Sequence, residues 1–536
     1  IWNGTSWSYG TSPTIDNLVD FQEDYNLGTD INACSCTISN GAAVTIQHGK
    51  TLNVINGVHV NNGTLTFADG ASLLQTNPDN NLNTGTIIYK RNSQPIRQAD
   101  YVYWSSPVKG QKLVNVSPLT AEDKYFSYNG TKWVMESKNN VMNIGKGYII
   151  RGPETFSNIN RFPFATAFIG VPNNGDIIGE TLGAEKPYLI GNPYPSALHA
   201  DDFINGNSFI EGTLYFWTHN TPVVLGGAYE YSTDDYATYN LTGGTGTGTM
   251  APSGINPGNN NSAPSGDIAA GQSFFVKTAA SGTIVFNNLM RRGGNTNSQF
   301  FKLSKGEKES EIEKNRIWLN MTNTEGAYKQ LLVGYIQGAT DEYDRRYDGT
   351  TFDGNKFLDF YSINNEHKLA IQGRALPFNT SDAVPLGYRT TIAGEFTISI
   401  HQVDGSLVLQ SIYLEDKKLN KIHNLRTGNY TFTTEIGTFT DRFVLRYTDK
   451  SLGIDEVKDA DNIVLVASKL NEMKVISTKE AISQVAVFDL SGRLLFEKKN
   501  INATELQILN FRSANQVLLV KVTLENGSTT TKKVAF

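Results

Sequence analysis

The chain has 536 residues, a net charge of −6 and only 18% charged residues. This length is enough for roughly three or four domains. Lys and Arg form no basic stripe, which argues against nucleic acid as a partner, and no run of about 18 apolar residues could cross a membrane as a helix. Gly, Thr, Asn, Tyr and Val dominate, which is typical of short strands and turns. The composition therefore predicts an all-β protein.

Residues 1–92 predict a β-solenoid-like region. The chain begins at Ile1 with no charged start before an apolar stretch, which indicates a processed chain or a fragment. From Thr37 on, apolar-polar-apolar triplets such as Val44–Ile46 alternate with Asn and Gly. Short strands at such a regular spacing predict the rungs of a solenoid. A plain β-meander is the alternative.

Cys34 and Cys36 are the only cysteines. Two residues at i and i+2 of one strand share a face, with Cα atoms roughly 6.5 Å apart, near the upper limit for a disulfide. The spacing favours a local disulfide and two free thiols equally. A metal site is disfavoured because no second Cys/His cluster lies nearby.

Residues 93–180 and 181–301 predict two copies of one β-rich unit. Tyr101–Pro107 in the first copy corresponds to Tyr188–Pro193 in the second, and Asn143–Ile150 corresponds to Asp267–Val276. Each copy runs from a strand through a Pro turn, an aromatic strand and a Gly turn to an apolar strand. The second copy contains an insertion at 242–266, rich in Gly, Thr, Asn, Ser and Pro, which we expect to be a long exposed loop.

Residues 302–316 are highly charged and predict a linker or a short helix. A β-sandwich is expected at 317–449, because strands such as Phe396–Ile400 alternate between apolar and polar residues. Asp344, Asp348 and Asp353 form the densest acidic patch, and their oxygens could bind Ca²⁺. A polar loop with internal ion pairs is the favoured alternative, and no other cofactor is expected.

Known catalytic motifs are missing from the sequence, including the Gly-x-Ser-x-Gly elbow, the His-Glu-x-x-His helix and the phosphate loop. We therefore expect a protein that is not an enzyme. Aromatic residues gather near the insertion and could form a flat platform for sugars, although aromatic strands more often belong to a core. These residues are Tyr215, Trp217, Tyr229, Tyr231 and Tyr236.

Residues 450–536 form a separate run of short strands. Val485–Leu495 reads as a strand, a turn on Asp489–Gly492 and a return strand, and Asn526-Gly527 is a strong hairpin signal before a basic final strand with Lys532 and Lys533. This order resembles the C-terminal sorting domain of cargo of the type IX secretion system of the Bacteroidota. The segment lacks the usual Pro-Asn-Pro start and is closest to the type C signal.

The resemblance implies a small Ig-like β-sandwich recognised by the outer-membrane translocon (SprA-type) and by a shuttle β-barrel (PorV-type). It implies a protein secreted to the cell surface or medium and similar to the C-terminal region of a large adhesin. A polysaccharide-binding surface protein and the non-catalytic tail of a secreted hydrolase are the alternatives. A short terminal strand can lie at a sheet edge and be bound by a partner. The expected recognition residues are Asp489, Gly492, Arg493, Asn526, Gly527, Lys532, Lys533, Val534 and Phe536.

Overall fold

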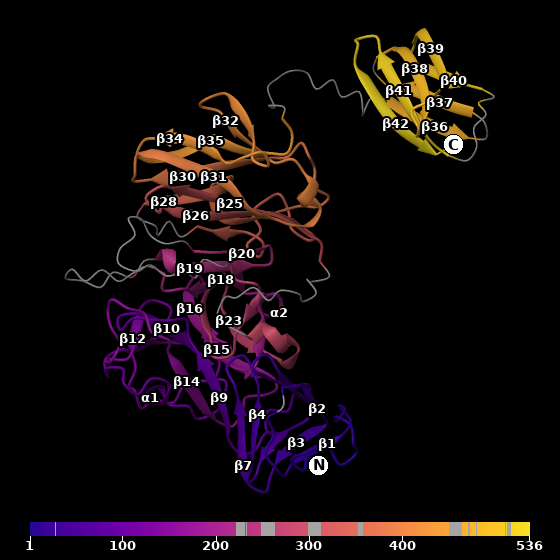
Figure 1. The fold of residues 1–536 in the computed structure, drawn as a ribbon. Coiled ribbons are helices and arrows are strands. Elements are labelled where there is room, and N and C mark those ends of the chain that lie inside the picture. The colour runs from indigo at the N-terminus through magenta and orange to yellow at the C-terminus, as the bar shows by residue number, and fades with distance from the viewer. Residues whose placement is uncertain are drawn as a thin grey trace. The chain divides into compact units, whose positions relative to one another are not determined.

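The computed structural model describes residues 1–26, 28–220, 231, 233–247, 263–297, 312–351, 357–449, 464–469, 472–478, 480–509, 511 and 516–535. The chain divides into two compact units, Ile1–Asp449 and Lys450–Phe536. Strands dominate both units (Figure 1), and α1 (Leu113–Val116) and α2 (Ala200–Gly206) are the only α-helices in this described part. None of its helices is long and apolar enough to cross a membrane. The predicted all-β fold class is confirmed.

The first strands form a parallel β-solenoid with three faces. Equivalent residues of successive rungs pair in parallel, as Val44 does with Leu65 and Leu52 with Leu73. A meander would pair its strands antiparallel, so the solenoid prediction is confirmed. The faces are β1 (Leu18–Phe21), β3 (Ser35–Ile38) and β6 (Val58–Val60); β2 (Ile31–Ala33), β5 (Thr51–Val54) and β8 (Ser72–Gln75); and β4 (Ala42–Ile46), β7 (Gly63–Phe67) and β9 (Ile87–Asn92).

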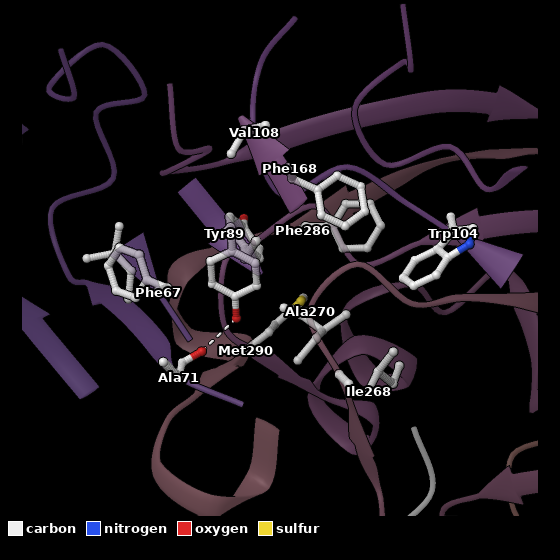
Figure 2. Close-up of a cluster of buried hydrophobic side chains, with 14 of the residues drawn as sticks. Phe67, Ala71, Tyr89, Trp104, Val108, Phe168, Ile268, Ala270, Phe286 and Met290 are labelled. Atoms are coloured by element: carbon white, nitrogen blue, oxygen red, sulfur yellow. Dashed lines mark hydrogen bonds between the residues drawn. The ribbon is translucent and has the colours of Figure 1, made fainter. Parts of the chain in front are cut away.

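Strand β9 joins the solenoid to the next part of the chain. It pairs in parallel with β7 and antiparallel with β14 (Ala165–Gly170), so the expected boundary at residue 92 falls inside one sheet. The two regions also share one hydrophobic core. Figure 2 shows Phe67 and Tyr89 of the solenoid near Phe168 and Met290, with the Tyr89 hydroxyl donating to the carbonyl oxygen of Ala71 over 2.7 Å. The solenoid is therefore not a separate domain.

Two sheets with the same strand order follow. The first is β10 (Tyr101–Trp104), β13 (Tyr148–Arg151), β11 (Tyr125–Tyr128) and β12 (Trp133–Met135). The second is β16 (Pro187–Gly191), β22 (Ser273–Thr278), β18 (Ile210–Trp217), β19 (Tyr236–Asn240) and β20 (Gly243–Thr245). Each is flanked by an antiparallel pair, β9 with β14 and β15 (Ile177–Leu182) with β23 (Gly282–Phe286). The common connectivity supports the interpretation of a duplicated unit.

The two sheets meet through reciprocal contacts. The backbone N–H of Ser105 donates to the carbonyl oxygen of Gly271 over 2.9 Å. The backbone N–H of Gly191 donates to the carbonyl oxygen of Gly145 over 3.1 Å. Ser105 corresponds to Gly191 in the repeat, and Gly271 to Gly145. Such an exchange of equivalent contacts is the pattern of a two-fold relation between two copies.

The start of the insertion at 242–266 is buried, which corrects the expectation of an exposed loop. The hydroxyl of Thr242 donates to the carbonyl oxygen of Tyr347 over 2.7 Å. The indole N–H of Trp318 donates to the carbonyl oxygen of Gly244 over 2.8 Å. Strand β20 thus packs against the following sheet, because its backbone groups find partners there. Residues 248–262 lie outside the described residues. A small sheet nearby contains β21 (Asp267–Ile268), β17 (Ala197–His199) and β24 (Arg291–Arg292).

One continuous sheet of eleven strands occupies the region predicted as a sandwich. It starts at Lys314, so the last residues of the expected linker belong to a strand. The sheet folds over on itself, because Phe432 of its last strand lies 4.8 Å from the ring of Phe443, near the other end of the strand order. In sheet order its strands are β33 (Lys421–Asn424), β32 (Tyr413–Asp416), β35 (Gly437–Arg446), β30 (Ala383–Thr390), β28 (Leu358–Asn364), β29 (His367–Arg374), β26 (Tyr328–Ile336), β25 (Lys314–Asn323), β31 (Gly394–Val403) and β34 (Tyr430–Thr434), with β27 (Gly349–Thr350) beside β29.

The C-terminal unit is a small two-sheet β-sandwich, as predicted. Its sheets enclose one core that includes Val475, Val487 and Val520. One sheet is β36 (Val464–Lys469), β37 (Glu472–Ser477) and β40 (Glu505–Ile508), and the other is β39 (Leu494–Ala503), β38 (Ile482–Asp489), β41 (Val517–Leu524) and β42 (Thr529–Ala535).

Candidate functional site

An aromatic cavity of about 370 Å³ lies where the two sheets of the duplicated unit meet. Strands of the first sheet supply most of one wall, and β18, β19 and the segment before β19 supply the other. We call this space the aromatic cavity, and its lining residues are Tyr101, Tyr103, Phe126, Trp133, Ile149, Trp217, Tyr231, Thr233 and Tyr236.

Equivalent positions of the two copies face each other around this cavity. Tyr128 pairs with Trp133 across β11 and β12, and Trp217 pairs with Tyr236 across β18 and β19. Side chains opposite each other on neighbouring strands lie on the same face of the sheet. Both sheets therefore present an aromatic pair at equivalent positions.

Ring packing holds the walls of the cavity in place. Tyr103 lies parallel to Trp217, with ring centroids 5.7 Å apart and an interplanar angle of 8°. Phe275 of β22 meets Tyr103 and Tyr236 edge to face, at 6.1 and 5.9 Å. Both arrangements are favourable for aromatic quadrupoles. The aromatic rings of the walls therefore support one another.

Few polar groups face this apolar surface, and they are neutral. The hydroxyl oxygens of Tyr103 and Tyr236 lie 2.6 Å apart, and burial raises the pKa of both, so both stay protonated. The indole N–H of Trp217 is buried and has no partner in the part of the chain that the structure describes. Behind the wall, His219 forms a hydrogen bond of 3.0 Å with the Tyr101 carbonyl oxygen, and burial lowers its pKa to about 3. The cavity thus offers hydrogen bonds without charge.

The aromatic residues predicted as a platform differ in their exposure. Tyr215 is buried in the central strand β18, so it is core rather than platform, and Trp217 is buried as well. Tyr231 is exposed at the cavity, and Tyr229 lies outside the described residues. Sequence reasoning missed the residues contributed by the first copy, which are Tyr101, Tyr103, Phe126, Trp133 and Ile149. Aligning the strands of the two copies would have found Phe126 and Trp133, which correspond to Tyr215 and Tyr236.

The acidic patch is a loop held by internal hydrogen bonds. The carboxylate of buried Asp348 accepts the backbone N–H of Asp344 over 2.7 Å and that of Gly373 over 2.9 Å. Burial raises its pKa to about 7. Asp353 lies outside the described residues, and no group of three or more potential metal-ligating residues occurs among those that are described. Asp348 therefore has a structural role in this loop.

Cys34 and Cys36 are both free thiols in the structure. Cys34 lies at the corner between β2 and β3, where its sulfur accepts a hydrogen bond of 3.3 Å from Asn56 Nδ2. Cys36 points into the solenoid core, and burial raises its pKa to about 12. The estimate of the distance between the two cysteines assumed that both lie in one strand. In the structure a corner separates them, so that estimate does not apply.

The predicted turn residues of the C-terminal unit form a tight hydrogen-bonded loop. Asp489 Oδ1 accepts the backbone N–H groups of Ser491 and Arg493, both over 3.0 Å, and Oδ2 accepts Arg493 Nε over 3.1 Å. The hydrogen bond from the Ser491 hydroxyl is the main cause of the lowered pKa of Asp489. Gly492 has φ +82°, which favours glycine. These residue types are thus explained by the turn itself.

The last strand lies at a sheet edge. Within its sheet β42 pairs only with β41, and the hairpin between them is closed by Asn526, whose side chain accepts the Ser528 N–H over 2.9 Å, and by Gly527 at φ +81°. Lys533 is exposed, whereas Val534 is buried in the core. Phe536 lies outside the described residues. Among the described strands β42 is thus the last of its sheet, the position at which partners commonly add a strand.

Comparisons with known proteins give two family matches and matches to solved structures. A model described as "Domain of unknown function (DUF8693)" matches residues 2–447, and one described as "Domain of unknown function (DUF8694)" matches residues 452–536. No curated protein matches. A structure described as "Biofilm associated protein - BSP domain" aligns over 83% of this chain and 95% of its own, with 9% identity and a TM-score of 0.11. At that TM-score the likeness does not establish a common fold.

Proposed function

We propose that this chain, which belongs to the family described as a domain of unknown function (DUF8693), is a non-enzymatic surface protein whose C-terminal unit is an export signal. The division of the chain carries the proposal: Lys450–Phe536 is a compact unit with its own core. A signal that must be recognised apart from its cargo needs that independence. The resemblance of this unit to type IX sorting domains supports the type IX system as the route.

Strand β42 is the proposed contact with the export machinery. It is the terminal strand of its sheet in the described part of the unit, and a translocon of the SprA type or a shuttle β-barrel of the PorV type could add a strand there. The exposed ammonium group of Lys533 would meet an acidic partner surface. The larger unit, Ile1–Asp449, is then the cargo, and an adhesin-like role at the cell surface is its proposed function.

Charge reversal on this edge tests the export role. Lys533→Glu should strongly reduce the amount of protein in the medium and at the surface and raise it in the periplasm, measured by immunoblotting of fractions. Lys521→Glu is the matched control, because Lys521 is an exposed lysine on the interior strand β41 of the same sheet. Equal export of both variants and the unaltered chain would count against recognition at β42.

Polysaccharide binding is the second candidate function, and the aromatic cavity is the observation that favours it. Neutral hydrogen-bonding groups among aromatic rings suit sugars, whose faces are apolar and whose edges carry hydroxyl groups. Retention of the purified full chain on immobilised neutral polysaccharides tests this function. The protein should be retained and then eluted by free sugar; passage through every matrix would exclude it.

A further inference from the structure

We propose that the aromatic cavity binds one neutral pyranose unit of a glycan. The inference rests on the second candidate function above and assigns to it a site and a class of sugar. It depends on three properties of the cavity, which are its size and opening, its hydrogen-bonding groups and its lack of charge.

The size of the cavity limits the ligand to something small. Ligand pockets commonly measure about 300–1,000 Å³, and 370 Å³ lies near the lower end. Trp133 is 37% exposed and Tyr231 40% exposed, and Thr233 is exposed beside them. These three residues form the mouth, whereas Tyr103 and Trp217 are buried at the back. One sugar unit can enter while the remainder of a glycan stays outside.

One buried donor of the cavity has no partner in the described chain. The indole N–H of Trp217 has no acceptor there, and a buried donor without a partner is destabilising. A sugar hydroxyl or ring oxygen is an acceptor of the right kind. The hydroxyl groups of Tyr103 and Tyr236, whose oxygens lie 2.6 Å apart, add neutral polar groups to the cavity. A donor at the back of a cavity with aromatic walls matches the hydroxyl-bearing edge of a pyranose ring.

The absence of charge selects among sugars. None of the nine lining residues is acidic or basic. A buried carboxylate or sulfate without a cation would carry a large desolvation cost. Neutral hexoses are therefore favoured, and uronic acids and sulfated sugars are disfavoured.

Calorimetric titration of the purified full chain tests the proposal. The probes are the methyl glycosides of glucose, galactose, mannose and N-acetylglucosamine, with glucuronic acid as the anionic probe. At least one neutral glycoside should bind, and glucuronic acid should bind about tenfold more weakly or not at all. No binding of any neutral glycoside overturns the proposal, and so does tighter binding of glucuronic acid.

Three substitutions assign the binding to the cavity. Trp217→Phe removes the indole N–H, Tyr236→Phe removes a hydroxyl, and each should weaken binding by about five- to tenfold. Trp133→Ala removes an exposed wall at little risk to folding and should weaken it by about tenfold. Tyr9→Ala is the control, because Tyr9 is 88% exposed on the N-terminal region and should leave binding unchanged.

The failure of this inference and that of the underlying function give different results. Retention on polysaccharide that survives Trp217→Phe and Trp133→Ala would overturn the cavity as the site and leave polysaccharide binding standing. Loss of retention in these variants, with unchanged thermal unfolding and unchanged retention of Tyr9→Ala, is the result expected if the cavity binds the sugar.

Discussion

Gly191 faces Ser105 so closely that a Cβ added at Gly191 would lie 2.2 Å from the Cβ of Ser105. The two residues are equivalent in the repeat, since Ser105 directly follows β10 and Gly191 ends β16. Equivalent residues face each other only where they lie near the pseudo-two-fold axis that relates the two copies. The space between them holds only one side chain. The first copy supplies that side chain, Ser105, and the second copy has a glycine, Gly191.

A second pair also combines one glycine with one serine, but here the glycine belongs to the first copy and the serine to the second. Gly147 of the first copy corresponds to Ser273 of the second, which pairs with Gly191 across β16 and β22. A Cβ at Gly147 would lie 2.8 Å from the Cβ of Ser273. Each copy thus contributes one serine and one glycine to the contact. This distribution explains why the copies differ at the positions where they meet.

We predict that Gly191→Ala destabilises the larger unit by about 1–3 kcal/mol or more, because it overfills a close-packed contact. Urea unfolding followed by fluorescence measures the change. Gly428→Ala is the control, because Gly428 has open space around it and no positive φ, so its effect should stay within about 0.5 kcal/mol.

An exchange of the two residues tests the symmetry directly. The double variant Gly191→Ser with Ser105→Gly places the single side chain on the other copy and should recover most of the stability lost in Gly191→Ser alone. Additive destabilisation in the double variant would contradict the two-fold relation of the contact.

Asp348 should make the stability of the larger unit depend on pH. Its pKa in the folded protein is about 7, above the ordinary value of about 3.9 for aspartate. The folded state therefore favours the protonated carboxyl, and this contribution is full below about pH 4 and is lost as the pH rises through 7. Asp348→Asn removes it, so the stability of the variant relative to the unaltered chain should increase between pH 4 and 8.

The size of this effect follows from about 1.4 kcal/mol per pKa unit, which sets a limit of a few kcal/mol. Urea unfolding at pH 4.5, 6 and 8 measures it. Glu325→Gln, at an exposed turn, should show no comparable trend. A pH-independent difference between Asp348→Asn and the unaltered chain would show that Asp348 does not titrate in this range.

The two cysteines should differ sharply in reactivity. Thiolate is the reactive form, and Cys36 is buried with its pKa raised to about 12. Cys34 is only partly buried. In native protein an aromatic disulfide reagent should modify one thiol per chain, at Cys34 as located by peptide mass spectrometry, and two after denaturation. A mass two units lower with no reactive thiol in the denatured protein would instead indicate the disulfide.

The sequence predicted the architecture best where a local pattern determines a strand. The triplets around Val44–Ile46 identified the solenoid, and the repeated strand and turn motifs identified the two copies. Boundaries were predicted less well, because β9 belongs to two regions at once through pairings that are distant in sequence. The polar residues around Thr242 have the composition of a loop, but Thr242 is buried and its hydroxyl donates to the carbonyl oxygen of Tyr347.

The aromatic cavity was only half predicted for a related reason. Trp217, Tyr231 and Tyr236 stand near a conspicuous insertion, whereas Tyr103 and Trp133 come from the other copy and meet them only in three dimensions. Turn residues such as Asp489 and Gly492 were identified from the chain alone, since the turn is local. The sequence does not show, however, that the Asp489 carboxylate accepts its hydrogen bonds from within the turn.

The central claim is that the C-terminal unit directs export by itself. The direct measurement is the distribution of a periplasmic fluorescent reporter fused to residues 450–536, expressed in a bacterium with a type IX system and compared with a fusion to 450–528 that lacks β42. We predict that the first reporter reaches the surface or medium, that the second stays in the periplasm, and that both stay there in a translocon-deficient strain. Retention of the first fusion in the periplasm of the secreting strain, with the unit intact and folded, would contradict the claim.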